Sequence, residues 1–306
     1  MSNTSMPGGE ALTGPLLKAV SRSFFLTIRW LPQAMQDGVA LGYLLARATD
    51  SVADTSSADS EEREQILCLM GEAVAGLLSR EAESELLHAL GGALAEAQSN
   101  PAERVLLCRF GECLQILRAM PEGQARLIRE VLATIVEGQL WDLRYFREQS
   151  TVKDDAQTRK YTYQVAGCVG KFWTELGLET MGKAFCDPAR KQVMLEAGVR
   201  YGCGLQLVNI LRDCAEDATR GRCYLCSSRS AWLGRAERYL RDGVDYSTRL
   251  RGFRLRFASM LPALIGLRTI QLLRQRPEGE RVKVPRRTVY ACMLQAVWLS
   301  SVQRAS

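Results

Sequence analysis

The sequence predicts an all-α fold built as one domain. Apolar residues recur at three- and four-residue spacing through most of the 306 residues, and no segment sustains the alternation of a strand. Hydrophobic residues make up 47% of the chain, which is ample material for a core. No Pro- or Gly-rich linker separates the predicted helices. We therefore expect a lead-in of small and polar residues over 1–14 and one helical domain over 15–306.

Start signals divide the apolar pattern into separate helices. Asp59, with Glu62 three residues later, has the arrangement of a capping box. Asn100 followed by Pro101 supplies a helix cap and a proline in the first turn, and Asp187 with the next proline repeats this device. Polar, charged loops are predicted at 149–158, 218–230 and 274–286. The predicted helical segments are 15–32, 35–54, 61–79, 83–97, 103–120, 122–148, 161–185, a helix from 188, and 288–302.

Two pairs of aspartates carry the strongest functional signal. Asp213 and Asp217 are four residues apart with Asn209 one turn upstream, so on a helix the three side chains share one face. Asp50 and Asp54 repeat the spacing at the end of an apolar segment. Like charges at this spacing repel each other and require a positive partner. Pairing with nearby arginines is the simpler interpretation; Mg²⁺ is the functional one, because it takes one or two carboxylates while phosphates and waters complete its coordination.

Composition excludes several other chemistries. The net charge is +6, but basic and acidic residues are interleaved, so no nucleic-acid-binding stripe is present. Arginines instead lie beside the acidic pairs, Arg47 at the first and Arg212 and Arg222 at the second, which fits a phosphorylated small molecule. The single histidine, His88, lies in an ordinary amphipathic run, and this excludes Ser-His-Asp and Cys-His catalysis and His-based zinc sites.

Cysteines and apolar segments bear on the compartment. The ten cysteines stand singly apart from Cys223 and Cys226, and residues 1–14 show no secretory leader, so we expect reduced thiols and a cytoplasmic protein. No apolar run reaches the roughly 18 to 20 residues that cross a bilayer. The run 288–302, preceded by basic residues, is expected to be a packed terminal helix, with peripheral membrane contact as the alternative.

Two shorter segments allow a structural and a functional interpretation. In 161–170, two tyrosines precede small residues at 166–168 and 170. Small residues in a core helix usually mean close helix packing, but opposite the acidic pairs they would let an apolar chain lie along the helix. Donors to a phosphate are also available in the segment Ser21, Arg22, Ser23 and Phe24.

Four ordered motifs together resemble the squalene/phytoene synthases, the head-to-head prenyl transferases of the all-α isoprenoid synthase fold. They are SRSF at 21–24, YLLARATDSVADT at 43–55, YTYQVAGCVG at 161–170 and QLVNILRDCAEDATRGRCYL at 206–225. The resemblance covers roughly residues 15–290. It implies a single helical bundle with a central active-site cavity, in which Asp50, Asp54, Asp213 and Asp217 hold Mg²⁺ against the diphosphates of two farnesyl or geranylgeranyl diphosphates.

The resemblance also implies roles for the other motif residues. Tyr161 matches a catalytic tyrosine and Tyr43 a second pocket tyrosine. Ala53 replaces an acidic residue that eukaryotic squalene synthases carry, which leaves one fewer metal ligand. The implied substrate contacts are Ser21, Arg22, Ser23, Phe24, Arg47, Gln206, Asn209 and Arg222, with Val165 and Ala166 in the wall of the prenyl channel. The implied cofactor contacts are Arg22, Arg47, Arg212, Lys283 and Arg286.

The implied chemistry suits a chain without a histidine base. Ionising an allylic diphosphate needs cations that stabilise the leaving group and apolar surroundings that exclude water, and a tyrosine or the released diphosphate takes the proton. Members of the family then reduce the product with NADPH to squalene, lose a proton to give dehydrosqualene or phytoene, or stop at presqualene diphosphate. The basic strip around Lys283 and Arg286 resembles the strip that meets the cofactor phosphate in squalene synthases, and this resemblance favours NADPH, bound outside any Rossmann unit. Phytoene synthases also have a basic segment near the same place.

Three alternatives stay open. The first is an NADPH-independent phytoene, dehydrosqualene or presqualene diphosphate synthase. The second is a non-catalytic scaffold, because some proteins of this fold have lost the aspartates and act by binding partners. The four aspartates present here argue against a scaffold. The third is a lipid-surface binding module, which rests only on the basic, apolar C-terminal tail.

Overall fold

A computed structural model describes residues 12–21, 24–55, 59–277, 279–280 and 282–301. Within them the regular structure is helical and no strand occurs; an isolated bridge joins Thr151 and Cys223. This confirms the predicted all-α class. The chain forms two compact units, Met1–Arg29 with Gln33–Leu143, and Trp30–Pro32 with Arg144–Ser306. The single domain over 15–306 stays a prediction.

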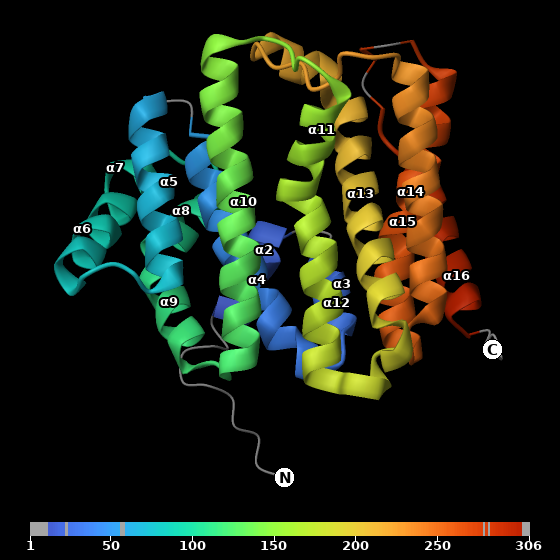
Figure 1. Cartoon of the computed structure of the whole chain (residues 1–306), viewed down its shortest axis with the longest axis horizontal. Helices are drawn as coiled ribbons and strands as arrows, with labels where there is room; N and C mark the ends of the chain where they lie inside the picture. Colours follow the sequence, from blue (N-terminus) through green and yellow to red (C-terminus); the bar gives the residue numbers. More distant parts are fainter. Residues whose placement is uncertain (1–11, 22–23, 56–58, 278, 281, 302–306) are drawn as a thin grey trace. The chain divides into compact units, whose positions relative to one another are not determined.

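The first unit is organised around α4, Gln33–Ala53, whose apolar residues Leu41, Leu44, Leu45 and Ala48 are buried. This helix packs against α5, α8 and α9 (Figure 1). The remaining elements are a π-helix at Leu12–Leu16, α2 Leu17–Ser21, α3 Phe24–Trp30, α5 Ser60–Ala75, α6 Arg80–Gly91, α7 Ala93–Glu96, α8 Pro101–Cys108, α9 Phe110–Ala119 and α10 Glu122–Glu148. The division between the units falls within α3, after Arg29, and within α10, after Leu143.

The predicted caps are present in the first unit, but more than one predicted helix is broken. The segment expected over 83–97 divides at Gly92 into α6 and α7. The Asp59 side chain accepts from the Ser60 N–H, and the Asn100 side chain accepts from the Ala102 N–H. The continuous helix expected over 103–120 was wrong, because the chain breaks at Arg109 between α8 and α9. Arg109 donates to Glu112 at 2.8 and 2.6 Å, and the three-residue spacing of that pair is also compatible with an unbroken helix, so periodicity alone missed the break.

The second unit is centred on α13, Lys191–Thr219, which packs against α12, α14 and α15 (Figure 1). Trp232 and Tyr246 are among the largest fully buried side chains of its core. The other elements are α11 Asp155–Thr162, a π-helix at Tyr163–Gly167, α12 Cys168–Met181, 3₁₀ turns at Gly182–Ala184 and Pro188–Arg190, α14 Arg229–Arg249, α15 Phe253–Gln275 and α16 Arg286–Ser301. None of the described helices is long and apolar enough to span a membrane.

Helix α11, which precedes the π-helix, begins earlier than predicted. We expected a loop over 149–158, but α11 already starts at Asp155, because the Asp154 side chain caps it by accepting from the Gln157 N–H at 2.9 Å. The polar composition of this turn of helix resembles that of a loop, and this concealed the start.

Close contact of α13 with the π-helix and with α12 accounts for Gly167 and Gly170. A methyl group added at Gly170 would lie 1.9 Å from the Gly198 carbonyl oxygen, and one added at Gly202 would lie 2.2 Å from that of Ala166. Only glycine permits such an approach. Of the two interpretations of this stripe, close packing therefore applies to Gly167 and Gly170, where α13 atoms approach the backbone. The packing interpretation holds there.

Candidate active site

The first acidic pair lies at the C-terminal end of α4. Asp50 is in the last turn and Asp54 directly follows the helix, and the Asp54 N–H donates to the Asp50 carbonyl at 2.9 Å. The C-terminus of a helix carries partial negative charge, so each carboxylate there is disfavoured by about 0.3–1 kcal/mol. The position therefore demands a cation.

Arg47 supplies part of that charge. It donates to Asp50 at 2.6 Å and, through its other terminal nitrogen, to Glu103 on α8 at 2.6 Å. Glu103 is fixed in turn by donors from Asn100 at 2.8 Å and Ser51 at 3.2 Å. Burial opposes ionisation of Glu103, but these bonds hold its pKa below the usual value. Sequence reasoning gave Glu103 no functional role and missed this contact.

The surroundings of Asp50 hinder its ionisation. The pKa of Asp50 is raised to about 7, chiefly because protein atoms displace water and also because Asp54 repels its charge, while Arg47 opposes the shift. Its side chain nevertheless keeps 44% of its surface exposed, so a cation can reach it. A bound cation would favour the ionised form and lower the pKa again.

Two predicted site residues near this pair, Tyr43 and Ser21, donate their hydroxyl protons to backbone carbonyls. The Tyr43 hydroxyl donates to the Val20 carbonyl at 3.2 Å. Ser21 is buried and donates to the Leu17 carbonyl at 2.5 Å, so its proton is not directed at a ligand. Arg22, Ser23 and the side chain of Phe24 lie outside the described residues.

The second acidic pair lies near the C-terminal end of α13. Asn209, Asp213 and Asp217 belong to this one helix, as their spacing predicted. Asn209 is exposed, and its amide donates to Gln206 at 3.4 Å. Arg212 donates twice to Asp213, from Nε at 2.8 Å and from Nη2 at 2.5 Å. Both acidic pairs thus have an arginine bound to one member at a helix C-terminus, where the dipole favours cations.

A tight turn follows α13 and is held by backbone bonds. Gly221 adopts a φ of +73°, and the Arg222 N–H donates to the Asp217 carbonyl at 2.9 Å. The Cys223 N–H donates to Ser150 at 2.9 Å, and its carbonyl accepts from Val152 at 3.0 Å. Arg222 is therefore placed one short turn beyond Asp217.

This turn also positions Tyr161. The ring of Tyr161 stacks on that of Tyr224, with centroids 4.9 Å apart and planes at 12°. Phe146 packs edge-on against Tyr224 at 5.0 Å, and the Thr158 hydroxyl donates to the Tyr224 carbonyl at 2.7 Å. Tyr224 was missed by sequence reasoning, because it lies 63 residues after its partner. Val165 and Ala166, the expected channel residues, are half-buried in the π-helix.

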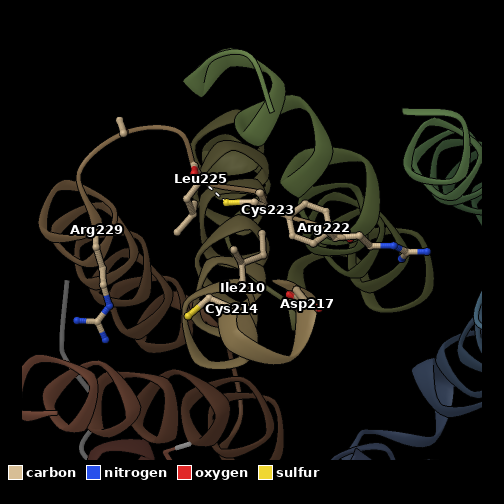
Figure 2. A pocket seen from close by; sticks show the side chains of 9 residues that line it. Ile210, Cys214, Asp217, Arg222, Cys223, Leu225 and Arg229 are labelled. Carbon is tan, nitrogen blue, oxygen red and sulfur yellow. Dashed lines mark hydrogen bonds between the residues drawn. The ribbon is translucent and has the colours of Figure 1, made fainter. Parts of the chain in front are cut away.

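A cavity of ≈ 190 Å³ adjoins the second acidic pair (Figure 2). Figure 2 shows the Arg222 guanidinium extended away from Cys214. Arg229 donates to the Leu273 carbonyl at 2.9 Å. Asp217 and the turn that carries Arg222 both line this cavity. Its lining consists of Ile210, Cys214, Asp217, Arg222, Cys223, Tyr224, Leu225, Ser227 and Arg229.

The donor set fits magnesium held together with a phosphate. Across the part of the chain that the structure describes, no three carboxylate, thiol or imidazole side chains converge as a metal cage. Each acidic pair offers hard oxygen donors from two carboxylates, which is the share that protein usually supplies to Mg²⁺ when substrate phosphates and waters provide the rest.

The candidate cofactor residues lie apart from these pairs in the chain. Lys283 is exposed in the segment before α16, and Arg286 is exposed as the first residue of that helix.

Comparison with known proteins points to one family. The family model described as squalene/phytoene synthase matches residues 17–230, which include all four aspartates. The chain is 26% identical over 238 residues to the bifunctional lycopene cyclase/phytoene synthase of Blakeslea trispora, covering 78% of this chain and 35% of that protein. It is 27% identical over 217 residues to the presqualene diphosphate synthase of Zymomonas mobilis, covering 68% of this chain and 57% of that protein.

Other similarities concern shorter stretches or the fold. The 15-cis-phytoene synthase of Synechococcus elongatus is 37% identical over 112 residues, 36% of this chain and 35% of that protein. The matches to the Blakeslea and Synechococcus proteins thus span about a third of the length of each. A ligand complex of TcSQS has a TM-score of 0.73 at 22% identity and covers 96% of this chain and 89% of that one. A dehydrosqualene synthase has a TM-score of 0.64 at 18% identity, covering 97% and 98%.

Proposed function

Because the chain belongs to the squalene/phytoene synthase family, we propose that it joins two prenyl diphosphates head to head with the help of magnesium. The family consists of prenyltransferases whose members use a divalent metal with diphosphate substrates. One observation carries the proposal for this chain. Both acidic pairs stand at the C-terminal end of a long helix, each with an arginine bound to one carboxylate.

Each side chain has a role that follows from its contacts. Asp50, Asp54, Asp213 and Asp217 would hold the metal. Mg²⁺, when bound, supplies positive charge that stabilises the departing diphosphate. Arg47 and Arg212 neutralise Asp50 and Asp213 in the ligand-free protein. Their planar forks also match phosphate oxygens, so each can exchange a carboxylate for a phosphate without leaving its helix.

Tyr161 is the proposed catalytic tyrosine of the second unit, where it could accept the proton. Its ring lies parallel to Tyr224, which limits rotation, and Arg222 sits two residues before that ring. The stacking would keep the Tyr161 hydroxyl at a constant place relative to the Arg222 turn. Val165 and Ala166 would contribute apolar wall that keeps water from the carbocation.

For the product, we propose squalene, formed from two farnesyl diphosphates through presqualene diphosphate with reduction by NADPH. Support for this product comes from the basic strip at Lys283 and Arg286, both of which are exposed and available to a cofactor phosphate. The second candidate is an NADPH-independent reaction that ends at presqualene diphosphate, dehydrosqualene or phytoene. Relatives named phytoene synthase and presqualene diphosphate synthase favour it.

Release of pyrophosphate from farnesyl and geranylgeranyl diphosphate tests the shared proposal. We expect release that requires Mg²⁺ and falls at least 100-fold in Asp50→Asn and in Asp213→Asn. Matched controls are Asp37→Asn, which is exposed on the same α4, and Glu216→Gln, which is exposed on the same α13. No release by the folded wild-type protein would favour the scaffold alternative, and full activity in both aspartate variants would remove the metal assignment.

Product analysis with and without NADPH then separates the two candidates. Squalene that appears only with NADPH supports the reductive reaction, and Lys283→Ala combined with Arg286→Ala should then raise the KM for NADPH about tenfold or more. Identical products in both conditions would assign the chain to the second candidate.

A further inference from the structure

Helix α16 carries its large apolar side chains on the outside. Cys292, Ala296 and Ser300 are the buried residues of this helix, which packs against α15 (Figure 1). Cys292 and Ala296 join the core cluster formed with Phe257 and Met260. The opposite side of the helix carries a stripe of exposed apolar residues, which lie within about 100° of one another around the helix axis. It comprises Tyr290 (63% exposed), Leu294 (73%), Val297 (42%) and Trp298 (66%).

The start of the same helix is basic and free of acidic residues. Residues 282–301 contain Lys283, Arg286 and Arg287, all exposed, and neither Asp nor Glu. Tyrosine and tryptophan combine an apolar ring with a polar group and are favoured at the boundary between lipid and water. The stripe thus has the composition of a helix that lies in a membrane surface.

We propose that α16 binds an anionic lipid surface, with Tyr290, Leu294 and Trp298 among the lipid chains and Arg287 against the head groups. Charge distinguishes this occupant from a second copy of the chain. A second copy would present the same acid-free stripe and offer no carboxylate to the arginines, whereas anionic head groups supply that charge. The inference concerns attachment to the surface and does not depend on the proposed function.

Sedimentation with lipid vesicles, without substrate, tests the proposal. We expect the full chain to bind vesicles of phosphatidylcholine with about 30% phosphatidylglycerol, and to bind pure phosphatidylcholine at least tenfold more weakly. Raising the salt concentration should weaken the first interaction. Leu294→Ser with Trp298→Ser should weaken binding at least tenfold, and Arg287→Gln about fivefold. Leu77→Ser and Arg126→Gln, at exposed positions of the first unit, should bind as the wild type does.

Two further measurements keep the test decisive. Brominated lipid should quench the tryptophan fluorescence of the wild type but not that of Trp298→Phe, which preserves the apolar stripe. Absence of vesicle binding at low salt, or equal binding by the folded double serine variant, overturns the proposal. A concentration-dependent dimer that the double variant abolishes, with no vesicle binding, would assign the stripe to a second copy instead.

Discussion

Arg212 donates two hydrogen bonds to the carboxylate of Asp213, the next residue in the chain, from Nε at 2.8 Å and from Nη2 at 2.5 Å. It therefore occupies the oxygens that a metal ion would take. In the other unit Arg47 binds Asp50 at 2.6 Å and has a second anchor in Glu103. In both places the guanidinium would compete with the proposed metal ion for one carboxylate, and a guanidinium also suits a phosphate. The first two predictions separate these roles.

Replacing Arg212 by alanine should change the affinities for phosphate and for metal differently. We expect inorganic pyrophosphate with Mg²⁺ to bind about tenfold more weakly, because a charge-assisted donor is lost. The affinity for Mg²⁺ alone should be unchanged or higher, because Asp213 loses a competing cation. Isothermal titration measures both. Arg220→Ala, which removes an exposed arginine paired with Glu216, is the control. Weaker metal binding with unchanged pyrophosphate binding would contradict this account.

Glu103→Gln should impair turnover through Arg47. The neutral amide still fits between Asn100 and Ser51 but holds the guanidinium less firmly, so we expect kcat/KM to fall about tenfold with the thermal midpoint nearly unchanged. Arg47→Lys should be at least as impaired, because a single ammonium cannot span Asp50 and Glu103 as the planar fork does.

Glu112→Gln is the control for this prediction, since Glu112 makes an equivalent pair with Arg109. Steady-state kinetics and circular dichroism give the two readouts. Wild-type kinetics in Glu103→Gln would show that Arg47 needs no second anchor.

The stability of the metal-free protein should depend on Asp50 between about pH 4 and 7. The pKa of Asp50 is raised from 3.8 to about 7 in the folded protein, so the folded state binds this proton more tightly than the unfolded state does. The resulting stabilisation is complete below the ordinary pKa and is lost as the pH rises through about 7. The thermal midpoint of the wild type should therefore fall relative to Asp50→Asn over this range.

Mg²⁺ with pyrophosphate should reverse that difference at pH 8 in the wild type only, because the amide introduced by Asp50→Asn carries no charge for the cation. Thermal melts at several pH values, with and without the two ligands, make the comparison. A constant difference between the two proteins at all pH values would show that Asp50 titrates normally.

Gly170→Ala should destabilise the second unit. The added methyl group would meet the Gly198 carbonyl oxygen at 1.9 Å, so α12 and α13 must separate, at a cost of about 2 kcal/mol or more. Gly234→Ala on α14 is the matched control, because its nearest contact would be Arg238 at 3.6 Å and alanine favours a helix by about 0.5–1 kcal/mol. Chemical denaturation followed by circular dichroism measures both, and equal midpoints would refute the close packing.

Local signals predicted much of this fold, and contacts between distant segments escaped prediction. The Asn100 cap and the placement of Asp213 and Asp217 on one helix follow from neighbouring residues, and the structure agrees. The contact of Arg47 with Glu103 joins residues 56 positions apart, and no periodicity reports it. The stacking of Tyr161 on Tyr224 escaped for the same reason. Acidic pairs are visible in a sequence, whereas the groups that orient them depend on how the helices pack.

The π-helix at Tyr163–Gly167 fixes the angle around the helix axis between Tyr161 and the glycines that follow it. An extra residue in one turn rotates everything downstream by about 100° relative to an ordinary helix. Deleting a single residue here would straighten the segment and make it more regular. It would also rotate Tyr161 away from Tyr224, or Gly170 away from Gly198. A change that makes the helix more regular would therefore disrupt the contacts around it.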